Sequence, residues 1–139
     1  MIIDGKNLIM GRLAALVAKQ ALLGNKVDIV NAEDIVIVGK RDAIFAKYKK
    51  KFDRKTARKG PYIPRMPDRF VRRAIRNMLP YNQDRGIQAL RRIMCHIGVP
   101  DKFKNEKIEA IDNINVLNTR NIKYLTVKEL CRILGRSIE

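Results

Sequence analysis

The sequence predicts an α/β fold, and two observations lead to that prediction. A strand, a helix and two further strands follow one another, at residues 1–4, 11–23, 26–31 and 35–38. This order is typical of an α/β domain, in which helices cover a sheet. The 139 residues suffice for one domain with its own core, and an apolar fraction of 46% is ordinary for a folded protein. We therefore predict a single domain over residues 1–139.

The first helix is predicted from its apolar period. Gly24 and Asn25 supply its stop, and its apolar side chains recur at helical spacing, at Leu13, Leu16, Val17 and Ala21. Residues 26–31 alternate and are β-branched, which favours a strand. Residues 35–38 form a continuous apolar run that ends at Gly39, so we expect a buried strand there.

A second helix is predicted for residues 40–52, with one apolar side formed by Ile44, Phe45, Tyr48 and Phe52. Periodicity is then lost over residues 53–66, where Gly60, Pro61 and Pro64 interrupt the chain. A loop of this length inside a compact domain is typically functional or disordered.

The clearest helix is expected at residues 67–80. Pro67 and Asp68 mark its start and Pro80 its end. Its apolar stripe comprises Phe70, Val71, Ala74, Ile75 and Met78. The rest of its circumference carries four arginines, Arg69, Arg72, Arg73 and Arg76. The helix can therefore pack on the core while presenting arginine outward.

Three elements are predicted in the remaining chain. A helix is expected from Gly86 to Arg92 with Ile87 and Leu90 inward, and a strand follows at residues 93–97. A last helix spans residues 126–134 and ends at a glycine, with an inward side formed by Val127, Leu130, Cys131 and Leu134. Residues 99–125 show no pattern that predicts an element.

Charge is concentrated in the middle of the chain. Lys and Arg number 30 against 14 Asp and Glu, giving a net charge of +16. Residues 40–99 hold 18 basic and four acidic residues, whereas residues 1–39 are neutral and residues 100–139 carry +2. Such a charge opposes compaction unless a polyanion neutralises it. Nucleic acid is the usual partner, and an anionic membrane surface comes second.

We predict that residues 40–99 bind RNA. Lys and Arg neutralise phosphates and release counterions, and the planar guanidinium of Arg can also grip a phosphate with two hydrogen bonds or stack on a base. Tyr62, in the loop, is the best candidate for base stacking. The predicted RNA-binding residues are Arg12, Lys40, Arg41, Lys47, Lys50, Lys51, Arg54, Lys55, Arg58, Lys59, Tyr62, Arg65, Arg69, Arg72, Arg73, Arg76, Arg85, Arg91 and Arg92.

Catalytic chemistry finds little support. The only histidine is His96 and the only serine is Ser137, so a catalytic triad is not expected. His96 with its neighbour Cys95 does not supply the ligands of a metal site. The acidic pair Glu33-Asp34 favours a polar turn over an acid–base couple or a magnesium site. We predict no catalytic residue, metal, cofactor or small-molecule substrate.

The segment from Gly5 to Gly11 follows a strand and opens a helix, as phosphate-binding loops do. Five residues separate these glycines and Arg12-Leu13 follows, whereas a P-loop requires four residues and then Lys-Ser/Thr. A tight turn is the favoured interpretation, although backbone amides at this helix start could still hold an RNA phosphate.

The two cysteines, Cys95 and Cys131, are too few for a disulfide framework and too far apart in sequence for a zinc knuckle. We expect both to be reduced and buried, in a cytoplasmic protein. No apolar stretch approaches the ~18 residues of a spanning helix, and the first residues lack a secretory pattern, so no membrane association is expected.

Three blocks of the chain resemble a known family. They are MGRLAALVAKQALLGNKVDIVNAEDI at 10–35, GPYIPRMPDRFVRRAIRNMLP at 60–80 and RGIQALRRIMCHIGVPDKF at 85–103. In this order they resemble the L-thirteen family of large-subunit ribosomal proteins, in its archaeal and eukaryotic branch. One departure is Asn77, where the family usually has glycine.

The resemblance implies a three-layer α/β/α fold around a small, mainly parallel sheet of about four strands, with the basic loop and helix as an extension. It also implies a structural constituent of the large subunit that binds large-subunit rRNA and neighbouring ribosomal proteins, resides in the cytoplasmic ribosome, supports assembly and translation, and lacks catalytic activity. The alternative is a non-ribosomal RNA- or DNA-binding architectural protein. An RNA-modifying enzyme and a membrane-surface protein find less support in the residues.

Overall fold

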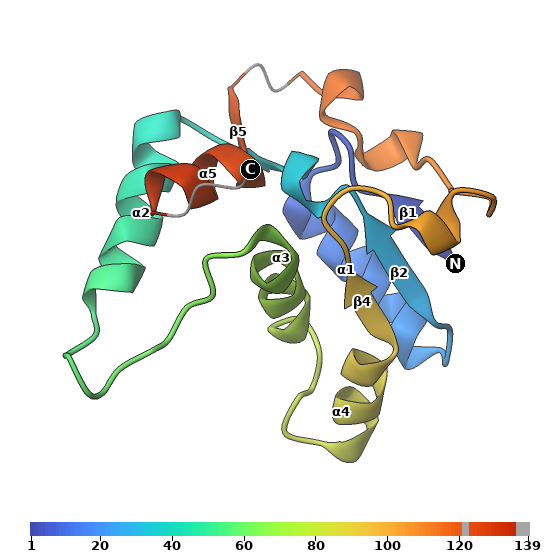
Figure 1. Cartoon of the computed structure of the whole chain (residues 1–139), viewed down its shortest axis with the longest axis horizontal. Helices are drawn as coiled ribbons and strands as arrows, with labels where there is room; N and C mark the ends of the chain where they lie inside the picture. Colours follow the sequence, from blue (N-terminus) through green and yellow to red (C-terminus); the bar gives the residue numbers. More distant parts are fainter. Residues whose placement is uncertain (121–122, 136–139) are drawn as a thin grey trace.

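The protein contains a three-stranded parallel sheet, which is drawn on the right in Figure 1. The structure, a computed structural model, describes residues 1–120 and 123–135. The strands are β1 (Ile2–Asp4), β2 (Val27–Val30) and β4 (Ile93–Cys95), and β2 lies between the other two. The register pairs Ile3 with Ile29 and Ile29 with Cys95.

Different segments of the chain pack against the two faces of this sheet. Ile3, Ile29 and Cys95 belong to the main core, together with the buried side of α1 (Met10–Leu22). That side of α1 includes the predicted Leu13, Val17 and Ala21, all fully buried. On the opposite face, Ile2 and Val30 pack in a small second cluster with Phe103, which lies in the segment after β4. The predicted α/β class is thus confirmed, whereas a helix layer on each face is not confirmed.

The strand predicted at residues 35–38 does not enter the parallel sheet. It forms β3 (Val36–Val38), which pairs in antiparallel orientation with β5 (Tyr124–Thr126) in a separate two-stranded sheet. Val36 is buried, but Ile37 and Val38 are only partly covered, because a two-stranded ribbon leaves one side open. The parallel sheet therefore has three strands rather than about four.

The other predicted helices are present. They are α2 (Arg41–Asp53), α3 (Pro67–Arg76), α4 (Asp84–Arg91) and α5 (Val127–Ile133). Ile44 and Phe52 are the buried side chains of α2, whereas Tyr48 and Phe45 are partly covered. Thr126 caps α5, since its hydroxyl accepts a hydrogen bond from the backbone N–H of Glu129 at 3.2 Å.

Two expectations about inward side chains and one strand boundary were wrong. Helix α3 ends at Arg76, so Met78 lies beyond it and is 47% exposed, while Leu79 is buried. Helix α4 turns Gly86 and Ala89 inward and leaves Ile87 exposed. Gly86 lies so close to Pro80 that a Cβ there would be 2.1 Å from the Pro80 carbonyl oxygen. This close approach determines which side of α4 is buried. Strand β4 ends at Cys95 rather than at residue 97.

The region that showed no pattern in the sequence contains short 3₁₀ turns and one strand. The turns are η2 (Asp101–Phe103), η3 (Asp112–Ile114) and η4 (Val116–Asn118), and β5 follows them. A further turn, η1 (Ala32–Asp34), joins β2 to β3. Turns this short have no apolar period, so nothing in the sequence pattern distinguishes them from loop.

Candidate RNA interface

The predicted RNA-binding residues lie mainly on α2, on the loop at residues 54–66, on α3 and on α4. This loop runs away from the core between α2 and α3 (Figure 1). All predicted residues are exposed except Arg72, Arg73 and Arg92, which are partly buried. Arg12 lies apart from the others in sequence, on the exposed side of α1.

The basic side chains of this surface form no ion pairs with acidic side chains among the described residues. Among residues 1–120 and 123–135, ion pairs join only Lys104 with Asp101 and His96 with Asp28. No Lys or Arg of residues 40–99 is paired with an acidic side chain in this described part of the chain. Several instead lie over aromatic rings, such as Arg76 over Tyr81 at 5.0 Å and Arg65 over Phe52 at 5.5 Å. The positive charges therefore remain available to an external anion.

Helix α3 gathers four arginines beside a groove. The spacing i, i+3, i+4 and i+7 places them on one side of the helix, where Phe70, Val71 and Ile75 occupy the buried side. The groove has a volume of about 330 Å³ and is lined by Tyr62, Leu90 and the arginines Arg69, Arg72, Arg73 and Arg76.

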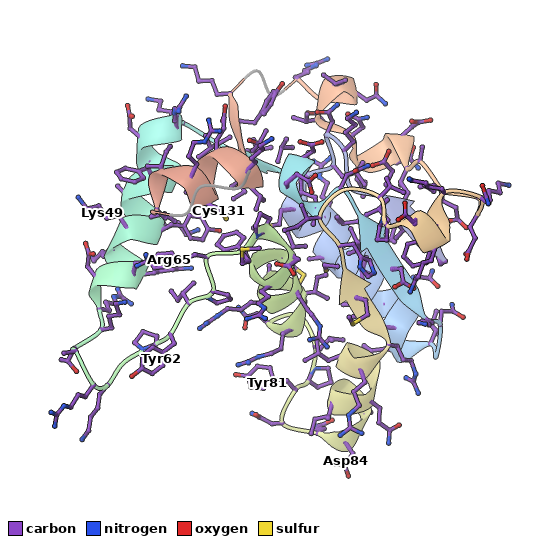
Figure 2. The ribbon with its side chains drawn as sticks, in the orientation of Figure 1. Lys49, Tyr62, Arg65, Tyr81, Asp84 and Cys131 are labelled. Carbon is purple, nitrogen blue, oxygen red and sulfur yellow. The ribbon has the colours of Figure 1, made fainter. Side chains whose placement is uncertain are left out.

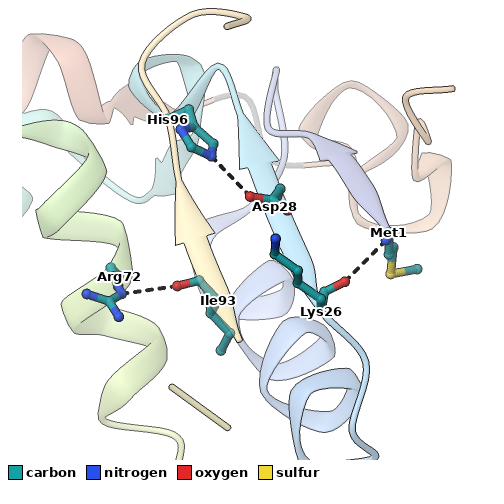
Figure 3. Close-up of polar contacts among 6 residues, drawn as sticks. All are labelled: Met1, Lys26, Asp28, Arg72, Ile93 and His96. Carbon is teal, nitrogen blue, oxygen red and sulfur yellow. Dashed lines mark hydrogen bonds and ion pairs between the residues drawn. The ribbon is translucent and has the colours of Figure 1, made fainter. Parts of the chain in front are cut away.

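Arg72 is tied to the fold as well as to the groove. Its Nε donates to the Ile93 carbonyl at 3.2 Å, as Figure 3 shows, and its Nη2 donates to the Leu90 carbonyl at 3.1 Å. These two carbonyls lie where α4 ends and β4 begins. Arg72 thereby connects α3 to the junction of α4 with the sheet.

Arg92 has a similar structural contact. Its Nη1 donates to the Ala21 carbonyl at 3.2 Å, in the last turn of α1, and the same carbonyl also accepts from the backbone N–H of Gly24 at 3.1 Å. Neither this contact nor those of Arg72 was predicted. A helical pattern shows which side of a helix an arginine occupies, but it does not show which distant carbonyl groups lie within its reach.

The loop at residues 54–66 has internal contacts of its own. Thr56 and Lys59 close a turn, in which the Thr56 N–H donates to the Lys59 carbonyl at 2.7 Å, and Gly60 has φ +139°. The Tyr62 hydroxyl donates to the Arg58 carbonyl at 3.0 Å, and Arg73 of α3 donates to the Tyr62 carbonyl at 2.9 Å. Figure 2 shows Tyr62 and Arg65 on this loop. Tyr62 is nevertheless 67% exposed, which suits the stacking role expected of it.

The other residues considered for chemistry have structural contacts. His96 Nε2 lies 3.1 Å from the carboxylate of the buried Asp28 (Figure 3). The His96 ring also packs on Phe103. Both carboxylate oxygens of Glu33 accept from the Gly98 N–H, at 3.0 and 3.1 Å, which makes the acidic pair part of a turn, as expected. The described residues contain no group of three side chains that could hold a metal ion. Ser137 lies outside the described residues.

The segment from Gly5 to Gly11 is a tight turn that leads into α1. The Gly5 N–H donates to the Val30 carbonyl at 2.9 Å, and a Cβ at Gly5 would lie 2.9 Å from that oxygen. The glycine is therefore required by close packing of the turn on β2. Gly11 already lies within the exposed side of α1.

Both cysteines are free and buried, as expected. Burial raises the pKa of the Cys95 thiol to about 12, and the carboxylates of Asp68 and Asp28 act in the same direction while Arg72 opposes them. Burial also raises the pKa of the Cys131 thiol to about 11, with Asp68 adding to the effect. Neither thiol has the lowered pKa of a reactive cysteine.

The fold and the surface together define a small, strongly basic protein of the α/β class with an arginine-lined groove. Within the described residues, no helix is long and apolar enough to span a membrane. The sequence profile described as Ribosomal protein L13 matches residues 1–102. The chain belongs to this family.

Relatives in archaea match nearly the whole chain. A protein of Archaeoglobus fulgidus named large ribosomal subunit protein uL13 is 39% identical over 96% of this chain and 86% of its own length. Proteins of the same name from Thermoplasma volcanium and Methanococcus maripaludis are 42% and 41% identical, over 96% and 97% of this chain and 97% of each relative. The predicted family and its archaeal and eukaryotic branch are thus confirmed.

Proposed function

We propose that this protein is a structural constituent of the large ribosomal subunit and binds large-subunit rRNA through residues 40–99. The unpaired positive charge of α2, the loop and α3 carries the proposal, because a surface of this charge requires a polyanion. Family membership, and the names of the archaeal relatives, support the RNA of the large subunit as that polyanion.

The protein acts as a scaffold rather than as a catalyst. Its polar residues with catalytic potential, His96 and Glu33, are engaged in contacts that hold the fold together. By fixing RNA segments against α3 and the loop, it supports subunit assembly and thus translation, within the ribosome of the cytoplasm. Its neighbours there include other large-subunit proteins, and it acts on no small-molecule substrate.

Sedimentation of a cell lysate through a sucrose gradient tests this function. We expect the protein to travel with the large subunit, in amounts matching other subunit proteins, at both ~50 and ~200 mM salt. An exposed protein with several phosphate contacts can lose ~10³–10⁵ in affinity over this range, so retention indicates an integrated component. Protein that remains at the top of the gradient would instead support a non-ribosomal nucleic-acid-binding role. Comparing its affinity for structured RNA with that for duplex DNA would then identify its ligand.

A further inference from the structure

The groove beside α3 is lined by both charged and apolar side chains. Four arginines contribute charged surface to its lining, whereas the exposed Tyr62, Pro64 and the aliphatic Leu90 contribute apolar surface. A duplex backbone presents only phosphate and sugar to a protein surface, and it does not require an apolar wall. A volume of about 330 Å³ also lies at the lower end of the range for small-molecule sites, ~300–1,000 Å³. The groove is therefore suited to a single planar group with charge at its edge.

One edge of the Arg72 guanidinium is already hydrogen-bonded to backbone carbonyl groups. Its Nε and Nη2 hydrogen atoms lie in the guanidinium plane and point at the Ile93 and Leu90 carbonyls. That edge cannot grip a phosphate with two hydrogen bonds. The Nη1 and second Nη2 hydrogens at the outer edge and the flat face of the guanidinium remain, and guanidinium faces stack on nucleobases. Since two carbonyls fix the plane, this stacking surface is formed before any ligand arrives.

Tyr62 is held in a similar way from the loop side. Arg73 binds its carbonyl oxygen and Arg58 accepts from its hydroxyl, while 67% of the residue is exposed. An aromatic ring that is anchored at both ends, yet open to solvent, loses little freedom when a base stacks on it.

We propose that this groove binds one unpaired RNA nucleotide, whose base is extruded from its helix and stacks against Tyr62 and the Arg72 guanidinium. The inference rests on the proposed function and adds the kind of RNA feature that α3 recognises. Arg69 and Arg76, which are exposed and form no ion pair within residues 1–120 and 123–135, contact the phosphates on either side of the extruded nucleotide. Seven residues of helix separate them by about 10 Å along the axis, so the two can engage different phosphates.

Binding of the full-length protein to three hairpin RNAs of equal stem length tests the inference. One hairpin is fully paired, one carries a single unpaired nucleotide in the stem, and one carries an abasic residue at that place. Each of the four bases is tried at the unpaired position. At about 150 mM salt we expect the hairpin with the unpaired base to bind roughly 5- to 150-fold more tightly than both others.

Two variants test whether the preference for an unpaired base depends on the Tyr62 ring. Tyr62→Leu removes the ring and should abolish the difference between the hairpins, whereas Tyr62→Phe keeps the ring and should preserve it. Circular dichroism verifies that both variants fold. Equal affinity of the unmodified protein for all three hairpins would overturn the inference while leaving RNA binding intact. A preference that Tyr62→Leu leaves unchanged would also overturn it. Absence of binding to every hairpin would contradict the proposed function itself.

Discussion

At the scale of single residues, Arg72 serves both the interior and the surface. Two of its nitrogens bind carbonyl groups at the junction of α4 and β4, while its side chain lines the groove beside α3. Arg69, one turn earlier on the same helix, is exposed and has no such contact in the part of the chain that the structure describes. The same residue type in the same helix thus has two different tasks.

Replacing Arg72 with Gln should reduce the free energy of unfolding by about 1–3 kcal/mol, because two partly buried carbonyl groups lose a charged donor. Replacing Arg69 with Gln should leave stability within about 0.5 kcal/mol. Urea unfolding of the two variants measures the difference. Equal stability of both variants would contradict the structural contacts assigned to Arg72.

At the scale of elements, the approach of α4 to the turn after α3 depends on the absence of a side chain at Gly86. The nearest atoms to a Cβ there belong to the Pro80 and Tyr81 backbone, which cannot move aside as a flexible side chain could. Gly11, in α1, has no atom within 4 Å of the corresponding position.

Gly86→Ala should therefore destabilise the protein by about 1–3 kcal/mol through overpacking. Gly11→Ala should be neutral, or stabilising by up to about 1 kcal/mol, because alanine favours helix. The melting temperatures of the two variants provide the measurement. Gly86→Ala tests the close contact of α4 with Pro80, and Gly11→Ala tests the effect of helix propensity alone. A Gly86→Ala protein as stable as the parent would show that α4 can move away from Pro80 without cost.

The elements that the sequence predicts well are those with an apolar period, such as α1 and α3. The prediction of which side of α4 faces inward was wrong. The apolar pattern places the bulky Ile87 inward, whereas the close approach of α4 to the Pro80 backbone leaves room only for Gly86. The partner of β3 was not predicted, since β5 lies in a region without a pattern. For the candidate interface, residue type and exposure follow from the sequence, but the contacts of Arg72 and Arg92 require the tertiary arrangement.

At the scale of the whole molecule, the net charge of +16 acts against the fold when no RNA is present. Most of that charge lies in one contiguous segment, and the described residues supply no acidic partner for it. Ions in solution can substitute in part, since the screening length falls from ~30 Å at 0.01 M to ~10 Å at 0.1 M salt.

The melting temperature of the free protein should therefore rise by several degrees between about 0.01 and 0.3 M potassium chloride. A variant with Lys47, Lys50 and Lys55 replaced by Gln should begin higher and rise less. The matching replacement of the same three residues by Arg keeps the charge and should behave like the parent. Scanning calorimetry provides the measurement, and a melting temperature independent of salt would contradict this account of the repulsion.

The strand order β1-β2-β4 also separates the order of synthesis from the order of folding. A chain leaves the exit tunnel from its N-terminus, at ~5–20 residues per second. The parallel sheet is incomplete until Ile93–Cys95 can dock beside β2, so residue 40 emerges roughly 3–10 seconds before this sheet can be completed. During that interval the most basic part of the chain is tethered, unfolded and next to an RNA-rich particle. Escort of the nascent chain until the third strand of the parallel sheet has emerged is thus a requirement that this topology creates.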